Sequence, residues 1–231
     1  GDADYSFVTF VVLKDRIRSG TREAVRRITR AGVKVVMITG DNRDTATHIA
    51  EECGIYKPSE GNICIDCEEL HKMSDAEVKA LLPDVRVVSR ALPQDKTRLV
   101  RLSQEMGLVA GMTGDGINDA PSLKLSDVGF AMGSGTDIAK SAGDVVILDN
   151  SISAIGNTIL YGRTIFKSIR KFITFQLIMN LAACGISLIG QFVGVENPIT
   201  IVQMLWVNII MDTLGGLAFS GEPALEYYMA E

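Results

Sequence analysis

Several features are scarce in this sequence of 231 residues, and each scarcity excludes a class of protein. Only four cysteines are present, at irregular spacing, so the chain lacks the disulfide framework of a small secreted domain, and cytosolic thiols are the simplest interpretation. The formal net charge is -5 and no basic stripe is present, so nucleic-acid binding is not expected. The first residues, GDADYSFVTF, lack the basic start and long apolar run of a signal peptide, and we expect them to come from the middle of a longer protein.

Charged side chains are nearly absent from residues 172–221, which contain only Glu196 and Asp212. Residues 1–171 carry most of the remaining charge. This asymmetry predicts a soluble domain over residues 1–150, then a cytoplasmic stalk helix over residues 151–171, and a membrane segment after it.

Two apolar stretches of this membrane segment, residues 172–195 and residues 197–221, are long enough to span a bilayer. A short turn joins them, so we expect a transmembrane helical hairpin. A basic cluster on the stalk precedes the first stretch, which places the soluble domain on the cytoplasmic side of an integral membrane protein in contact with the lipid bilayer. The alternative is a buried helix pair in a soluble protein.

Short apolar runs alternate with amphipathic stretches in residues 1–150. We expect strands at Phe7–Leu13, Val33–Ile38, Val85–Ser89, Leu108–Met112, Val128–Ala131 and Val145–Leu148. We expect helices at Thr21–Ala31, Arg43–Cys53, Asp75–Leu81 and Lys96–Met106. Three glycines just past helix ends are expected in the left-handed conformation: Gly32, Gly54 and Gly107. The alternation predicts an α/β fold with a parallel sheet, in which the chemistry gathers at the carboxyl ends of the strands.

Two of the predicted strands end in the same Thr-Gly-Asp turn, and a helix follows each. The first runs into residues 39–42, TGDN, and the second into residues 113–119, TGDGIND. Glycine lets the backbone approach a ligand, and free amides at the start of a helix favour an anion. Thr39 can donate its hydroxyl to a phosphoryl oxygen, while Asp115 and Asp119 suit an oxygen-ligand site for Mg²⁺. One such turn is more often only a helix cap, but two on neighbouring strands favour a phosphate site.

Between the two turns, Lys96 opens a predicted helix directly after a strand. Its ammonium group can lie over a phosphoryl group there and neutralise charge in the transition state. A lone lysine in this place is usually solvated, so the interpretation depends on its position between the two turns.

The order Thr39, Lys96, then Asp115 with Asp119 resembles motifs two, three and four of the haloacid-dehalogenase fold, a Rossmann-like parallel sheet. The strings MITGDN (37–42) and TGDGINDAPSL (113–123) resemble the phosphorylation domain of P-type ATPases, which are ATP-driven cation pumps with a phosphoaspartate intermediate. The resemblance covers essentially the whole chain.

The resemblance implies a role for each matching residue. Asp115 is implied as the ligand of Mg²⁺, with Asp119 as support for Lys96 and the loop. Asp41 and Arg90 are implied near the nucleotide, ATP. The phosphoryl group is held by a set of four residues: Thr39, Gly40, Lys96 and Asn118.

One element of this family is missing, the nucleophilic aspartate of an Asp-Lys-Thr-Gly-Thr stretch. The nearest string, residues 95–98 (DKTR), lacks the glycine and stands where the lysine of the third motif belongs. The resemblance therefore implies that the nucleophile, the nucleotide-binding domain, the actuator domain and four membrane helices lie upstream in the remainder of the same pump. This chain alone is then expected neither to hydrolyse ATP nor to form a phosphoenzyme.

Cys64 and Cys67 form a CxxC pair, with His71 four residues further on. A single CxxC is weak evidence for zinc, because a structural site needs a second pair of ligands. In the family that the chain resembles, this segment is a variable surface stretch. A zinc or redox role is therefore only a minor alternative.

Asp212 lies in the middle of the second apolar stretch, where a charge is costly unless it has a role. Asn208 is four residues earlier, hence on the same helix face, and two oxygen-bearing side chains one turn apart suit a hard cation. Asn180 in the first stretch is the third candidate ligand, although an interhelical hydrogen bond is its alternative role.

Residues 205–213, LWVNIIMDT, resemble the sixth membrane helix of calcium pumps, and Asn180 matches a ligand on the fifth. Two-site calcium pumps carry a glutamate and a threonine where this chain has Ala183 and Met211. Both losses fall on one ion site, a pattern that resembles plasma-membrane-type pumps, which move one Ca²⁺ per cycle. The resemblance thus implies Ca²⁺ as the transported ion, ATP as substrate and Mg²⁺ as cofactor.

Three other functions stay open. A soluble phosphatase of the same fold would need its own first motif and no membrane spans. A P-type pump for Na⁺, K⁺, H⁺ or Mn²⁺ would differ by only a few ligands. A non-catalytic membrane module is the third, if the chain exists alone.

Overall fold

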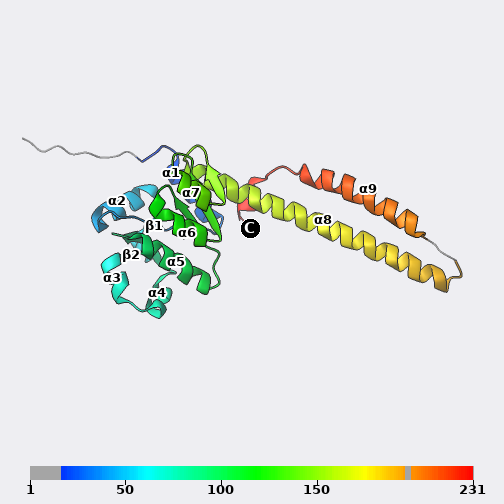
Figure 1. Cartoon of the computed structure of the whole chain (residues 1–231), viewed down its shortest axis with the longest axis horizontal. Coiled ribbons are helices and arrows are strands. Elements are labelled where there is room, and N and C mark those ends of the chain that lie inside the picture. Colours follow the sequence, from blue (N-terminus) through cyan, green and yellow to red (C-terminus); the bar gives the residue numbers. More distant parts are fainter. Residues whose placement is uncertain (1–16, 196–198, 231) are drawn as a thin grey trace, which may run out of the picture. The chain divides into compact units, whose positions relative to one another are not determined.

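The computed structural model describes residues 17–195 and 199–230. These residues form two compact units (Figure 1), one made of residues 17–23 and 36–109 and the other of residues 24–35 and 110–230. The predicted strand Phe7–Leu13 and the turn around Glu196 lie outside the described residues.

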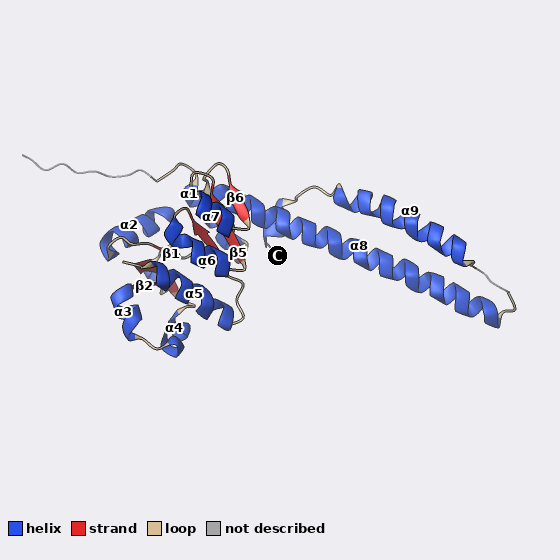
Figure 2. Cartoon of the chain, in the orientation of Figure 1, coloured by secondary structure: helices blue, strands red, loops and turns tan. Residues whose placement is uncertain are grey.

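The first unit is built on a parallel sheet of three strands in the order β1-β3-β2 (Figure 2). Its strands are β1 (Met37–Ile38), β2 (Ile63–Asp66) and β3 (Val85–Ser89). Its helices are α2 (Arg43–Cys53), α3 (Cys67–Lys72), α4 (Asp75–Leu81) and α5 (Pro93–Glu105), and a short 3₁₀ turn, η1, covers Pro58–Glu60. Ile38 lies beside Val88, and Asp66 beside Ser89, so the carboxyl ends of the three strands meet at one edge.

The core of this unit joins the sheet to α3, α4 and α5. Leu99 and Leu102 lie three residues apart on α5, on one helix face, and both are buried. They pack with apolar side chains of the strands and of the two shorter helices: Ile65, Leu70, Val78, Val85 and Val88. The buried apolar side chains of these helices therefore pack against the sheet.

Several predicted elements of this unit are confirmed and others are wrong at their ends. The bounds of α2, α4 and β3 are those predicted from the sequence. The predicted strand Val33–Ile38 is too long, because only Met37 and Ile38 pair with β3. The predicted helix Lys96–Met106 starts too late, because Pro93 already opens α5, in the first turn where its missing N–H costs nothing. Two elements of this unit, β2 and α3, were not predicted from the sequence.

The second unit holds another parallel sheet, in the order β4-β5-β6. Its elements are β4 (Gly111–Gly114), β5 (Val128–Met132), β6 (Val145–Ile147), the 3₁₀ turn η2 (Ile117–Asp119), α6 (Ala120–Leu125), α7 (Asp137–Ala142) and most of α1 (Thr21–Arg30). The predicted strand Leu108–Met112 is shifted, because pairing with β5 begins only at Gly111, and Val109 is 83% exposed. The prediction of parallel strands is confirmed, but the described residues form two three-stranded sheets.

Left-handed glycines follow the helices as predicted. Gly32, Gly54 and Gly107 have φ angles of 75°, 78° and 77°. Gly54 caps α2, and its N–H donates to the carbonyls of Ala50 and Glu51. The conformation ends each helix where the chain must turn.

A long helix, α8 (Ile152–Phe192), continues the second unit for 41 residues. It covers both the predicted stalk and the first apolar stretch without a break, and α9 (Ile201–Ser220) runs back along it (Figure 1). Both helices are long and apolar enough to cross a membrane, and their apolar side chains are largely exposed within the described residues. Exposed apolar faces of this kind fit lipid better than the interior of a soluble protein.

The segment after α9 returns to the stalk and ends in a 3₁₀ helix, η3 (Glu226–Ala230). Arg163 of α8 donates to the carbonyls of Tyr228 and Met229, and also to that of Ala31. The Tyr228 hydroxyl donates to Glu222 at 2.8 Å, and Lys171 pairs with the same carboxylate. These contacts hold the first half of α8 against its own unit.

Candidate functional site

The turn after β1 carries three of the predicted site residues. The Thr39 N–H donates to the carbonyl of Val88 at 3.0 Å, so the pairing with β3 extends one residue past the strand. The Thr39 hydroxyl donates to Oδ2 of Asp41 at 2.9 Å, and the Asp41 N–H lies 3.1 Å from the same hydroxyl oxygen. The next residue, Asn42, caps α2 by accepting from the Thr45 N–H at 2.9 Å. Local hydrogen bonds thus hold Thr39, Gly40 and Asp41 in one tight turn.

Arg90 follows β3 and is bonded to the same turn. Its N–H donates to the Asp41 carbonyl at 2.8 Å, and the next N–H, of Ala91, donates to the Thr39 carbonyl at 2.9 Å. Arg90 has a φ of 51°, a conformation uncommon outside glycine. Its guanidinium is half exposed and lies 3.8 Å from Asp66 and 3.6 Å from Glu68. The first unit therefore brings Thr39, Gly40, Asp41 and Arg90 together.

Lys96 was predicted to open the helix, but α5 already begins at Pro93, and Lys96 lies within its first turn. Its neighbour Asp95 points back to the helix start, where its Oδ2 accepts from the Leu92 N–H at 2.8 Å. Lys96 itself is half-buried.

The turn after β4 is built around Asp119. This carboxylate is 7% exposed and accepts from the N–H groups of Asp115 and Gly116 at 3.4 and 3.3 Å. The Asp115 carbonyl accepts from the Thr136 N–H at 2.8 Å, so the backbone of Asp115 is fixed on both sides. The side chains of Asp115 and Asn118 are exposed.

This geometry separates two carboxylates that looked alike in the sequence. Asp119 points inward and is occupied by backbone amides, so it fits a supporting role better than that of a metal ligand. Asp115 presents an exposed carboxylate from a fixed backbone, which is the donor that Mg²⁺ prefers. The second unit brings Asp115, Asn118 and Asp119 into one turn.

The predicted ion ligands lie on α8 and α9. Asn180 belongs to α8, and Asn208 and Asp212 stand one turn apart on α9. The helices approach each other where the Phe172 and Phe219 rings are 6.3 Å apart, and a Cβ on Gly215 would lie 3.5 Å from the Phe172 ring.

Sequence reasoning missed Gln176, which lies one helical turn before Asn180 on α8. Its Oε1 is buried and has no hydrogen-bond partner among the described residues. An unsatisfied buried oxygen is costly. Its spacing of four residues from Asn180 was the signal that could have found it.

The CxxC pair was predicted to lie on a surface stretch, and this prediction is wrong. Cys64 lies in β2 and Cys67 at the start of α3, and both are buried, because β2 pairs with β3. Burial, with a contribution from Asp95, raises the pKa of Cys67 to about 12, and burial raises that of Cys64. No group of three or more His, Cys, Asp or Glu side chains suited to a metal is found among residues 17–195 and 199–230.

Comparisons with known proteins bear on the family and the fold. A family model described as haloacid dehalogenase-like hydrolase matches residues 3–127, and a second model of the same description matches residues 110–159. A crystal structure of a zinc-transporting PIB-type ATPase in an E2.Pi state is 27% identical, with a TM-score of 0.61, and the match covers 94% of this chain and 29% of that one.

The similar curated proteins are much longer than this chain. Calcium-transporting ATPase 4, plasma membrane-type, of Arabidopsis thaliana is 44% identical over 229 residues, which are 99% of this chain and 22% of that protein. Plasma membrane calcium-transporting ATPase 3 of Homo sapiens is 39% identical over 237 residues, covering 96% of this chain and 19% of that protein. The chain thus spans about a fifth of the length of these relatives.

Proposed function

Because this chain belongs to the haloacid dehalogenase-like hydrolase family, we propose that it is the part of a P-type calcium pump that joins phosphoryl transfer to the ion site. The observation that carries the proposal is the identity of 44% over nearly the whole chain with a protein named as a calcium-transporting ATPase. In this proposal, residues 1–150 are the phosphorylation domain, 151–171 the stalk, and 172–195 and 197–221 two membrane helices. The soluble domain lies in the cytoplasm.

Phosphoryl transfer would join the γ-phosphoryl group of ATP to an aspartate from the upstream remainder of the pump, with ADP as the leaving group. Asp115 would hold Mg²⁺, which neutralises charge on the transferred group. Its fixed backbone and exposed carboxylate support this role. Asp119 would keep the turn in shape through the two amides that it binds.

The phosphoryl oxygens would be bound by the Thr39 hydroxyl, the Gly40 backbone, the Lys96 ammonium group and the Asn118 side chain. Thr39 already lies in a turn that faces the edge where parallel strands end, the usual place for such chemistry. Asp41 and Arg90 would contact the nucleotide. The Arg90 contacts with Asp66 and Glu68 are long, at 3.8 and 3.6 Å, and the Arg90 side chain is half exposed, so a nucleotide can replace them at little cost.

The transported ion would bind between α8 and α9, at Asn180, Asn208 and Asp212. These ligands end in oxygen, which suits Ca²⁺, whereas zinc sites favour cysteine and histidine. Ca²⁺ takes six to eight oxygen ligands, so carbonyls and a carboxylate from the remainder of the pump would complete the shell. Ala183 and Met211 stand where a second site would need oxygen ligands, which favours one Ca²⁺ per cycle.

The ion that stimulates ATP hydrolysis by the full-length protein tests this proposal. We expect Ca²⁺ to stimulate it and Asp212→Asn to abolish calcium-dependent phosphorylation by ATP. Ala183→Glu is the matched control and should change little, because the second site also lacks its threonine at Met211. Stimulation by Na⁺ or K⁺ in place of Ca²⁺ would overturn the calcium assignment while leaving the pump assignment standing.

The catalytic part of the proposal has a separate test. The chain of residues 1–231, incubated with labelled ATP and quenched with acid, should carry no label, because its nucleophile comes from elsewhere. Stoichiometric label on any aspartate of this chain would contradict the proposal.

A further inference from the structure

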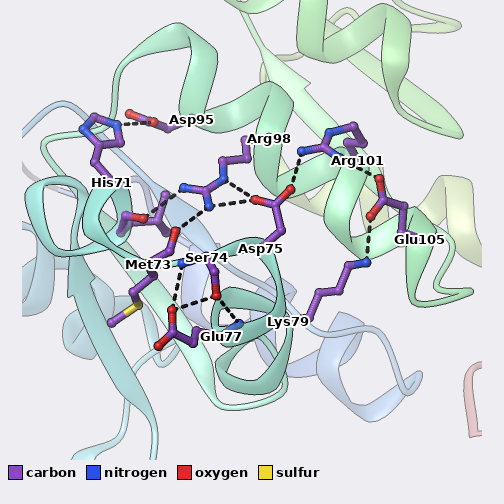
Figure 3. A network of polar contacts seen from close by, with 11 residues as sticks. His71, Met73, Ser74, Asp75, Glu77, Lys79, Asp95, Arg98, Arg101 and Glu105 are labelled. Carbon is purple, nitrogen blue, oxygen red and sulfur yellow. Dashed lines mark hydrogen bonds and ion pairs between the residues drawn. The ribbon is translucent and has the colours of Figure 1, made fainter.

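The buried carboxylate of Asp95 connects two segments of the first unit, the start of α5 and α3. Its Oδ2 accepts from the Leu92 N–H at 2.8 Å, at the start of α5. Its Oδ1 lies 2.6 Å from Nε2 of His71, which reaches it from α3 (Figure 3). The buried thiol of Cys67 lies on α3 one turn before His71, and Asp95 contributes to the rise in its pKa.

Asp95 remains a carboxylate although its side chain is only 2% exposed. Burial raises the pKa of Asp95, but the hydrogen bonds from Leu92 and His71 outweigh it, and the pKa lies below its usual value. Burial raises the pKa of the Cys67 thiol to about 12, so this neighbour adds no second charge. A buried charge of this kind is stable only while its donors are in place.

The rest of α5 is held by a different set of contacts (Figure 3). Arg98 donates to the carbonyls of Leu70 and Met73 at 2.9 Å and pairs with Asp75 at 2.7 Å. Arg101 pairs with the same Asp75 at 2.9 Å. The second and third turns of the helix are thus anchored independently, whereas Asp95 is the residue that ties the first turn to α3.

Lys96 directly follows Asp95 in this first turn. We propose that His71 is a positioning residue for phosphoryl transfer: its contact with Asp95 fixes that carboxylate, and thereby the direction in which Lys96 is presented to the phosphoryl group. The inference depends on the proposed role of Lys96. His71 lies on α3, which carries no residue of the proposed site. Its contact with Asp95 would link α3 to Lys96 and so to the phosphoryl group.

Orthovanadate, an analogue of the phosphoryl group, is the probe. Its affinity for the full-length protein with Mg²⁺ is measured from the rise in melting temperature with vanadate concentration, which needs no turnover. His71→Ala should weaken vanadate binding about tenfold, the size expected for one lost charge-assisted hydrogen bond. His71→Gln should restore most of it, because an amide N–H can still donate to Asp95.

Two controls separate positioning from general stability. His48→Ala removes the other histidine of the chain, which is exposed on α2, and should leave vanadate affinity unchanged. Asp75→Asn weakens the anchoring of the later turns by Arg98 and Arg101 and should lower the melting temperature without changing vanadate affinity. If Asp75→Asn weakens vanadate binding as much as His71→Ala does, His71 has only a structural role and the proposal is wrong.

A double-mutant comparison tests whether the effect passes through Lys96. Lys96→Met should weaken vanadate binding, and His71→Ala should add almost nothing in that background, because coupled residues are not additive. Additive effects would overturn the positioning role of His71. If Lys96→Met alone leaves vanadate binding unchanged, the proposed function of Lys96 fails instead, so the two failures are distinguishable.

Discussion

The turn after β1 and the turn after β4 share the string Thr-Gly-Asp, but their glycines are needed for different reasons. A Cβ on Gly40 would meet nothing closer than the Ala91 carbonyl, at 3.9 Å. A Cβ on Gly114 would lie 2.4 Å from Cβ of Asp119, a distance that no side chain tolerates. The backbone at Gly40 has free space beside it, into which a ligand can come. Gly114 is required because Asp119 packs directly against it.

The aspartates of the two turns differ in the same way. The exposed Asp41 carboxylate accepts from the hydroxyl of the half-buried Thr39 in its own turn. Asp115 makes its contacts through the backbone, which Asp119 and Thr136 hold from two sides, and leaves its carboxylate exposed. Hydrogen bonds hold the backbone of both turns, so the difference lies in the carboxylates: that of Asp41 accepts a bond within its own turn, whereas that of Asp115 is left exposed for the proposed metal ion.

The largest expected effect separates these two aspartates. Asp115→Asn in the full-length protein should lower phosphoenzyme formation by orders of magnitude, because the proposed Mg²⁺ ligand loses its charge. Calcium binding should be largely intact. Asp41→Asn, the matched variant in the other turn, should have a much smaller effect. Normal phosphoenzyme levels for Asp115→Asn at millimolar Mg²⁺ would exclude the metal assignment.

The next effect compares the glycines. Gly114→Ala should destabilise the protein by about 2–3 kcal/mol, because the new methyl group forces Asp119 and the turn apart. Gly40→Ala should change stability by less than about 0.5 kcal/mol, since the site has space. Thermal unfolding in detergent measures both. Equal losses for the two variants would show that the turns are built alike.

Substitution of Asp119 tests what holds the turn after β4 in shape. Asp119→Ala should cost about 1–2 kcal/mol, because the N–H groups of Asp115 and Gly116 lose their acceptor. Asn118→Ala, at the exposed neighbouring position, is the control and should be nearly neutral for stability. The same melting experiment applies, and a neutral Asp119→Ala would contradict the supporting role.

The smallest expected effect is at the start of α2, which follows the turn after β1. Asn42→Ala should cost about 1 kcal/mol, because the Thr45 N–H loses its cap. Asn42→Asp should retain the stability, since a carboxylate also accepts this bond and favours the helix N-terminus. A loss for Asn42→Asp equal to that for Asn42→Ala would show that the cap is not what holds α2 at this turn.

Much of the fold could be predicted because its signals are local. Helices α2 and α4 begin after capping residues, Asn42 and Ser74, and α2 ends at Gly54, so their bounds follow from neighbouring residues. The candidate residues Thr39 to Asp41 and Asp115 to Asp119 could be found because a strand, a turn and a helix follow one another in the chain. Strand ends such as Val33 and Leu108 could not, because they depend on which partner strand extends far enough to pair.

By itself, the sequence determined the alternation of strand and helix, the two Thr-Gly-Asp turns, and two apolar helices long enough to cross a membrane, because each depends on residues a few positions apart. Only the tertiary structure decided that Asp119 turns inward while Asp115 stays exposed. It also decided that His71 meets Asp95, which lies 24 residues further along the chain. The direction of a side chain is set by what packs against it, and those neighbours are distant in the sequence.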